Sequence, residues 1–226
     1  MEPFGEGLWI CDGMPMESFG LSYPVRMAVF RLGDGLALWS PVQFTEERRA
    51  AVAALGNVTH ILCPNSFHHI HAGDWHDAFP DAALWGAEGL AEKRRDLDFA
   101  GVLGVDPLPG ADDDLDTVVF DMRFTKEVVL FHRRSRTVIV CDLLQQVPQD
   151  MLSGLRLFIA RLDLMVGDAP QVPRKFRLAM RNMPSVKEAA RVMLAWPAER
   201  ILMAHGTPVA ANGAAVLASA FRWLRL

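Results

Sequence analysis

The amino-acid sequence predicts an α/β fold of two or three layers, with a second sheet of antiparallel strands in the second half of the chain. Short apolar runs of β type and amphipathic helical segments occur in two successive batches along the chain. Residues 101–116, which contain two prolines and an acidic run, form the irregular connection between the batches. A length of 226 residues is enough for one sizeable domain, and we expect residues 1–226 to form a single domain.

The first batch begins with a β-hairpin. Residues 25–32 and 36–39 are β-rich runs on either side of a Gly-Asp-Gly turn, which is a strong hairpin signal. Residues 45–55 start with a capping threonine followed by two glutamates, and their apolar residues gather on one face, so they predict a helix. Residues 58–63 form the next strand. Shorter elements are expected over residues 75–79, 83–85 and 89–95.

The second batch contains three β-like runs and then a helical region. Residues 118–121, 127–132 and 137–141 predict antiparallel strands. The pattern then becomes helical, and Ser185 followed by Glu188 has the spacing of a capping box. The expected elements after residue 149 are helices over residues 151–164, 174–182 and 185–196, a strand over residues 200–204 and a helix over residues 211–226.

Composition and charge are those of an ordinary globular protein. The formal charge is -4 with 51% hydrophobic residues, and both signs of charge are spread along the chain. The sequence has no basic stripe of the kind that binds nucleic acid, no secretory signal and no run long enough to cross a bilayer. We therefore expect a cytoplasmic protein that binds neither nucleic acid nor membrane. The apolar segment 152–166 and the terminal helix can supply a homo-oligomer interface.

The three cysteines, Cys11, Cys63 and Cys141, are odd in number. Cys63 and Cys141 lie at the ends of strongly apolar β-like runs, where thiols are usually buried. We expect free buried thiols rather than a disulfide.

Histidines are concentrated in one stretch. Five of the seven histidines of the chain fall between Thr59 and His76, directly after the strand at residues 58–63. Histidine is the commonest metal-coordinating side chain, so this density at the end of a strand is typical of a metal site. His68 and His69 are adjacent, and an extended backbone would direct them to opposite sides. His60, His71, His76 and His132 are interpreted as surface or structural residues.

Two further strands also end at residues that can bind metal. Asp142 follows the strand at residues 137–141, and His205 follows the strand at residues 200–204. Strand ends converge while the sheet fixes their backbones, so ligands are often placed in this way. Candidate ligands are therefore His68, His69, Asp142 and His205, and the alternative of a hydrogen-bonded turn residue stays open for Asp142 and His205.

With these motifs the sequence resembles the metallo-β-lactamase superfamily. The run I-L-C-P-N-S-F-H-H takes the place of strand-T-H-x-H-x-D-H, V-I-V-C-D that of the strand ending in Gly-Asp, and I-L-M-A-H-G-T-P that of the closing strand. The resemblance covers most of the chain, although its motifs are degraded. It implies a four-layer αβ/βα sandwich of two mixed β-sheets flanked by helices, and a metal-dependent activity.

The departures from the family pattern affect one of the family's two metal positions. Its ligands fall on Pro64, Ser66 and a residue at or near Arg123, none of which is a usual metal ligand. The second position keeps His68-His69 where the family has Asp-His, together with Asp142 and His205. A shift of the alignment by two residues would instead place His69 and His71 at the Asp-His region or its flank. Glu127 is either a substitute ligand or general base, or a solvated glutamate at a strand end.

Two hypotheses follow. The first is a metal-dependent hydrolase of unknown substrate with one divalent ion, zinc, iron or manganese, because histidines with a carboxylate suit all three. The second is a binding or scaffold protein of the same fold that has lost its metals, in which Arg123 binds an anion. The substrate, the oligomeric state and the histidine of the loop that faces the site are left open by the sequence.

Overall fold

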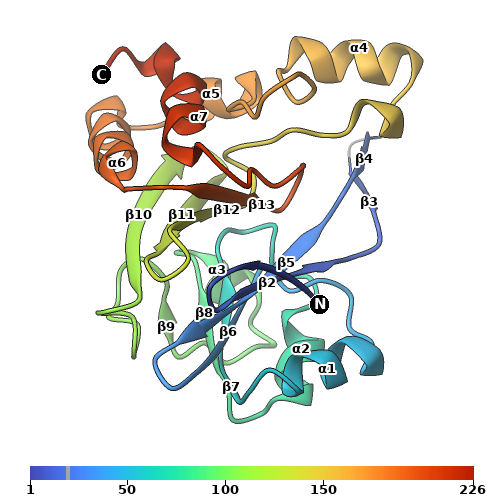
Figure 1. Cartoon of the computed structure of the whole chain (residues 1–226), viewed down its shortest axis with the longest axis vertical. Coiled ribbons are helices and arrows are strands. Elements are labelled where there is room, and N and C mark those ends of the chain that lie inside the picture. The colour runs from blue at the N-terminus through green and yellow to red at the C-terminus, as the bar shows by residue number, and fades with distance from the viewer. Residues whose placement is uncertain (19–20) are drawn as a thin grey trace.

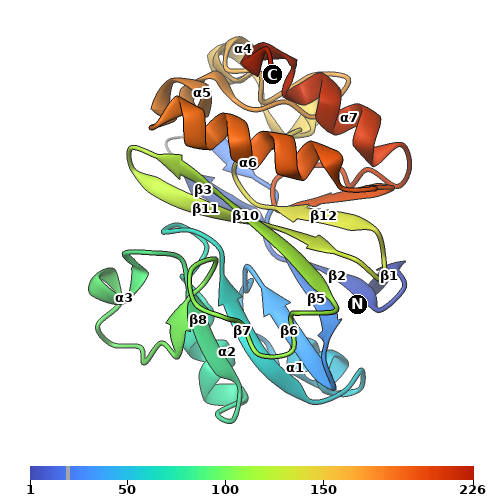
Figure 2. The ribbon, with the colours of Figure 1, turned by 90° about the vertical axis from the view of Figure 1, so that its left-hand side faces the viewer.

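Two β-sheets packed face to face, with helices on both outer sides, form the protein (Figures 1 and 2). The computed structural model describes residues 1–18 and 21–226. The predicted four-layer sandwich of two mixed sheets is confirmed.

The first sheet has seven strands in the order β1-β2-β5-β6-β7-β8-β9. The pairs from β1 to β6 are antiparallel and those from β6 to β9 are parallel, so the sheet is mixed. β3 and β4 form a separate two-stranded ribbon. The strands are β1 (Glu2–Gly5), β2 (Leu8–Asp12), β3 (Met16–Ser18), β4 (Leu21–Tyr23), β5 (Arg26–Leu32), β6 (Gly35–Trp39), β7 (Val58–Cys63), β8 (Ala83–Gly86) and β9 (Gly101–Val102).

The second sheet has four strands in the order β10-β11-β12-β13. β10 (Leu115–Met122), β11 (Thr125–His132) and β12 (Thr137–Val140) are antiparallel, as their sequence predicts, and β13 (Arg200–Met203) lies parallel to β12. The parallel pair requires the intervening residues to cross over, and this crossover contains three of the helices of the second half, whereas the last helix follows β13.

Helices cover the outer face of each sheet. On the first sheet lie α1 (Glu46–Ala53) and α2 (Ala72–Ala78), and α3 (Leu90–Lys93) lies at the edge of the sheet beside β8 (Figure 2). The second half contains α4 (Gly154–Leu162), α5 (Arg174–Ala179), α6 (Met183–Ala195) and α7 (Gly213–Ala220), with single 3-10 turns at Gln149–Met151 and Arg222–Leu224. In the part of the chain that the structure describes, each helix is too short or too polar to cross a lipid bilayer.

Three apolar clusters hold these layers together. The inner faces of the sheets pack around residues such as Phe30, Trp39 and Leu130, which are fully or almost fully buried. A second cluster joins the first sheet to α1 and α2, and a third joins the second sheet to α5, α6 and α7. Burial of apolar area on both faces of each sheet is the main force that fixes the strand ends in place.

The helix boundaries differ from prediction where local chemistry competes. α6 starts at Met183 rather than Ser185, because Asn182 adopts a left-handed conformation with φ 47° before it and Pro184 occupies the first turn, a favoured position for proline. Leu152 and Ser153 have extended backbones, so α4 starts at Gly154 rather than at residue 151. The predicted helix at residues 211–226 ends at Ala220 and continues as a 3-10 turn.

Candidate metal centre

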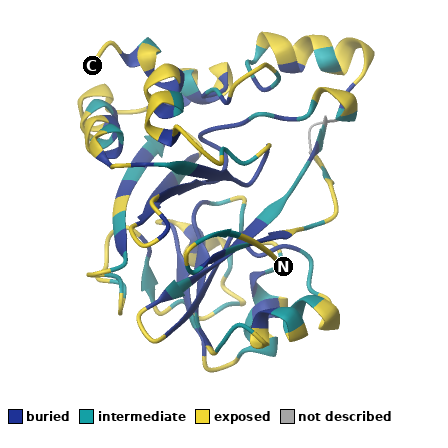
Figure 3. Cartoon of the chain, viewed as in Figure 1, coloured by how far each residue is buried: buried dark blue, intermediate teal, exposed yellow. Residues whose placement is uncertain are grey.

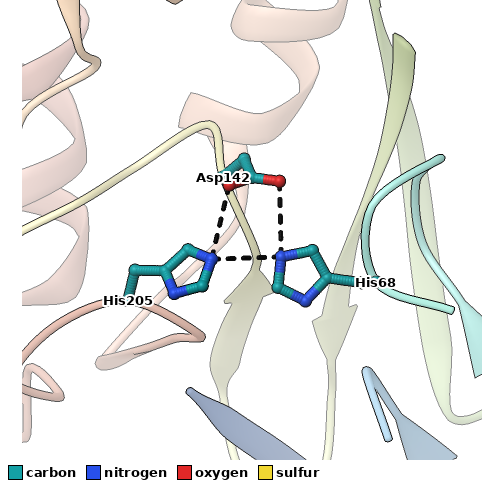
Figure 4. Close-up of side chains that lie close together, drawn as sticks. All are labelled: His68, Asp142 and His205. Carbon is teal, nitrogen blue, oxygen red and sulfur yellow. Dashed lines mark hydrogen bonds and ion pairs between the residues drawn. The ribbon is translucent and has the colours of Figure 1, made fainter. Parts of the chain in front are cut away.

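Three side chains from distant parts of the chain meet at one edge of the sandwich: His68, Asp142 and His205 (Figure 4). β12 and β13 are parallel, and Val140 is paired with Met203. Asp142 and His205 each follow two residues later, so they leave their strands side by side. His68 comes from the loop after β7 in the facing sheet. The predicted convergence of strand ends is thus what brings these three residues together.

The three side chains direct their acceptor atoms toward one point. The two Nε2 atoms of His68 and His205 are 3.2 Å apart. Nε2 of His68 lies 3.3 Å from Oδ2 of Asp142, and Nε2 of His205 lies 3.4 Å from Oδ1. A tetrahedral ion with bonds of about 2.0–2.1 Å separates its ligand atoms by about 3.3–3.4 Å. The spacing of these residues therefore fits a divalent ion held by two imidazoles and a carboxylate.

Hydrogen bonds on the far side of each imidazole orient the rings. Nδ1 of His205 lies 2.7 Å from the carbonyl oxygen of Pro24. Because a carbonyl only accepts, Nδ1 carries the proton and Nε2 presents its lone pair to the centre. Nδ1 of His68 lies 2.6 Å from the hydroxyl of Ser40, which can accept in the same way. This arrangement is the one that metal-binding histidines use.

The electrostatics of Asp142 favour its charged form. Burial by itself would raise the pKa of this carboxyl, but the charges and hydrogen bonds of His68 and His205 outweigh burial and hold the pKa well below its usual range. The pKa of His205 is raised in turn, because contact with Asp142 exceeds the opposing effect of burial. The centre thus combines a fixed negative charge with two imidazoles that attract a cation or a proton.

Glu127 is wholly buried on β11, and this corrects the interpretation of a solvated glutamate at a strand end. Its carboxylate accepts hydrogen bonds from the backbone N–H groups of Cys141, Asp142 and Leu143, at 2.9 to 3.1 Å. Burial, and then the charge of Asp142, raise the pKa of Glu127 above its ordinary value. Glu127 therefore fixes the turn that carries Asp142.

Asn65 joins the two carboxylates, and sequence reasoning did not single it out. Its Nδ2 donates to Asp142 Oδ2 at 2.8 Å and to Glu127 Oε2 at 3.3 Å. Its Oδ1 accepts from the backbone N–H groups of Phe67 and His68, so it also shapes the loop that carries His68. The sole signal in the sequence is a polar residue directly after a strand and a proline, which is too common to be specific.

The other histidines lie outside the group of three. His69, predicted as a ligand with His68, is buried, and its Nδ1 contacts the guanidinium of Arg94 at 3.0 Å. His132 is fully buried between Ser135 and the carbonyl of Arg31. His60, His71 and His76 are on β7 and around α2.

Residues at the family's first metal position do not form a ligand group. Pro64 is buried, and the backbone N–H of Ser66 donates to Thr125. Arg123 is exposed in the turn between β10 and β11. All three cysteines are buried free thiols, as expected.

Comparison with known proteins agrees with this geometry at the level of the fold. Residues 8–90 match the family described as Domain of unknown function (DUF4336). No protein of curated function matches the sequence.

Solved structures of the metallo-β-lactamase fold match nearly the whole chain. A metallo-β-lactamase from Pontibacter korlensis has a TM-score of 0.61 and 13% identity, covering 99% of this chain and 97% of its own. A metallo-β-lactamase from Erythrobacter litoralis gives 0.60 and 14%, covering 99% and 91%. A metal-soaked flavodiiron core from Synechocystis sp. PCC6803 gives 0.62 and 13%, covering 99% and 60%. This chain has the metallo-β-lactamase fold, in a divergent form.

Proposed function

We propose that this protein is a metal-dependent hydrolase with one divalent ion at His68, Asp142 and His205. The observation that carries the proposal is the convergence of two imidazole nitrogens and one carboxylate at separations of 3.2 to 3.4 Å. Three protein ligands on a tetrahedral ion leave one position open, which is the arrangement of catalytic rather than structural zinc sites.

A bound ion of this kind lowers the pKa of a water molecule and polarises a carbonyl or phosphoryl oxygen. The residues of the chain supply the remaining conditions. Pro24 and Ser40 hold the imidazole rings in orientation through their contacts with Nδ1. Asn65 and Glu127 fix the carboxylate of Asp142 by holding its side chain and its backbone. Zinc, iron(II) and manganese all suit this mixed nitrogen and oxygen set.

The ligand set points to one ion rather than two. Pro64, Ser66 and Arg123 take the places of the other position's ligands, and their side chains offer no group that usually binds a cation. With no second ion to share the charge of the transition state, we expect weaker hydrolysis than in relatives with two metals.

Elemental analysis of protein purified without chelator tests the ligand set. The wild type should contain about one equivalent of zinc, iron or manganese, and His68→Ala and His205→Ala should lose it. His69→Ala is the matched control, because this neighbouring buried histidine lies outside the group of three, and it should keep its metal. The proposal would be wrong if the wild-type protein were stable without bound metal. It would also be wrong if the His69 variant were the one that lost its metal.

Chromogenic esters, phosphodiesters and a cephalosporin test the reaction class. Activity toward one of these substrates should vanish with chelator, return with added metal, and stay absent in His205→Ala at equal folded fraction. Activity that survives chelation equally in the wild type and the His205 variant would contradict a role for the centre.

A second candidate is a metal-free binding protein of the same fold. The close packing of the centre favours it, since the side chains of His68, Asp142 and His205 are 8%, 11% and 5% exposed. In that state one imidazolium proton would lie between the two Nε2 atoms, and the exposed Arg123 would be free to bind an anion. Stabilisation by phosphate, lost in Arg123→Gln, with no response of the melting temperature to chelator, would support this candidate over the first.

A further inference from the structure

Helix α4 presents a row of apolar side chains to solvent. Leu155, Phe158, Ile159 and Leu162 are 71%, 58%, 48% and 51% exposed. They are spaced at i, i+3, i+4 and i+7, which places them on one face of the helix. Of the nine described residues of α4, Ala160 alone is buried. Single exposed apolar residues are ordinary, but four large ones on one face mark an interaction surface.

Positive charge accompanies this face. Arg156 and Arg161 are exposed within the same helix. Residues 151–187 contain seven of the chain's 23 basic residues and two of its 27 acidic residues, a net of +5. The other residues therefore hold 16 basic and 25 acidic side chains, a net of -9. The stretch from α4 to the first turns of α6 is thus more basic than the rest of the chain, and Arg156 and Arg161 place positive charge beside the apolar row itself.

The position of α4 leaves this face accessible. The helix lies at one end of the molecule, beyond the second sheet, and is mostly exposed (Figures 1 and 3). Its C-terminus is tied to α5, because Asp163 accepts from the backbone N–H groups of Arg174 and Lys175 at 3.0 and 2.8 Å. The buried side of α4 packs through Ala160 in a small cluster with Tyr23 and Met165. The apolar row therefore projects outward from a fixed base.

We propose that α4 is a peripheral attachment site for an anionic lipid surface. Amphipathic helices with apolar side chains on one face and arginines beside them bind in the plane of the headgroups, by apolar burial and attraction to anionic lipid. A second copy of the chain fits less well, because a two-fold interface through α4 would bring Arg156 and Arg161 of the two copies together. The sequence-based expectation of no membrane contact rests on the lack of a spanning run, which surface attachment does not need.

Vesicle co-sedimentation of the full chain tests the proposal. The wild type should bind vesicles of phosphatidylcholine with a quarter phosphatidylglycerol far better than phosphatidylcholine alone, and binding should fall with added salt. Removing both arginines by Arg156→Gln and Arg161→Gln should weaken binding about 25-fold, at about fivefold for each charge. Phe158→Ser and Ile159→Ser together should weaken binding to both kinds of vesicle.

Matched variants separate this surface from general effects of charge and hydrophobicity. Val105→Ser removes an apolar side chain that is 65% exposed after β9, and Arg95→Gln removes an exposed arginine after α3. Both should bind vesicles as the wild type does, and the melting temperatures of all variants should agree.

Three outcomes would overturn the proposal. The first is no binding to anionic vesicles. The second is equal loss of binding in the control variants. The third is a wild-type dimer, measured by light scattering, that does not bind vesicles and that Phe158→Ser converts to a monomer. This result would mean that α4 binds a second copy of the chain.

Discussion

The two carboxylates on either side of Asn65 are both buried, yet their surroundings differ in kind. Glu127 faces donors: three backbone N–H groups and the Asn65 amide. Asp142 accepts from Asn65 at 2.8 Å and from Gln145 at 3.4 Å, and otherwise faces the Nε2 atoms of two histidines. The hydrogen-bonding capacity of Glu127 is thus satisfied by donors of the fold, whereas Asp142 faces the site with part of its capacity to accept left over.

This difference separates a structural polar network from a site. A buried acceptor whose lone pairs are all satisfied by N–H groups stabilises the fold and has little capacity left for a ligand. A buried acceptor that faces other acceptors is unfavourable unless a cation or a proton lies between them. On this criterion Glu127 belongs to the framework and Asp142 to the site.

Glu127→Ala should have the largest effect on stability. It leaves three buried backbone N–H groups without an acceptor and opens a cavity, so the free energy of unfolding in urea should fall by about 4 kcal/mol. Glu127→Gln keeps one acceptor oxygen and should cost about half as much. The exposed Glu92→Ala on α3 is the control and should stay within about 0.5 kcal/mol. Equal stability of all three variants would remove the distinction between the two carboxylates.

Asn65→Asp should have the second largest effect on stability. The substitution keeps Oδ1 for the backbone of the histidine loop but replaces the donor between two carboxylates with a third acceptor. We expect a loss of about 3 kcal/mol in the free energy of unfolding, measured by urea denaturation. Asn212→Asp, at an exposed turn before α7, should be nearly neutral. A neutral Asn65→Asp would mean that Asn65 does not couple the two carboxylates.

Ser40→Ala should weaken metal binding at the site while leaving the stability of the fold almost unchanged. It removes the hydroxyl beside Nδ1 of His68, and the loss of such a contact typically weakens metal affinity about 10- to 100-fold. The free energy of unfolding of the metal-free form should change by about 1 kcal/mol or less. Competition with a fluorescent chelator measures the affinity, and the exposed Ser185→Ala provides the baseline. Unchanged affinity would show that Ser40 does not orient the ring.

Substitution of His132 should have the smallest effect, which appears in how stability depends on pH. Burial lowers the pKa of His132 below 6.5, and both ring nitrogens are engaged, by Ser135 and by the carbonyl of Arg31. Because the pKa of His132 is lower in the folded state, the unfolded chain binds this proton at a higher pH than the folded chain does. The contribution of neutral His132 to the free energy of unfolding is therefore complete above pH 6.5 and is lost as the pH falls below that value.

The wild type should therefore lose up to about 1.4 kcal/mol more than His132→Gln between pH 7.5 and 5.5, measured as urea midpoints at each pH. Asp114, Glu6 and Arg134 also act on the pKa of His132, and they are the same in both proteins. Parallel pH profiles would contradict the lowered pKa.

The sequence predicted most of the fold because its strands are strongly apolar and its turns contain glycine. The hairpin of β5 and β6, the helix capped by Thr45 and the antiparallel strands from β10 to β12 all follow these signals. Ser185 misled the prediction of a helix start, because a left-handed Asn182 followed by a proline in the first turn outweighs a capping-box spacing.

The candidate site was predictable where it depended on strand ends and not where it depended on hydrogen bonds between elements. Asp142 and His205 follow directly from the ends of two apolar runs, whereas the choice of His68 over His69 depends on how the loop coils. Ser40 and the carbonyl of Pro24 contact the centre from two other segments, and Asn65 contacts it from the loop that also carries His68. Such pairings leave no periodic or spacing signal along the chain.

The separation of the three residues along the chain has a consequence for the order of assembly. His68 and His205 lie 137 positions apart, and their contact needs the pairing of β12 with β13 and the docking of one sheet on the other. Contacts that close such long loops form late in folding. The centre thus comes into existence only once both halves have joined, so an ion taken up there would act as a latch that slows their separation.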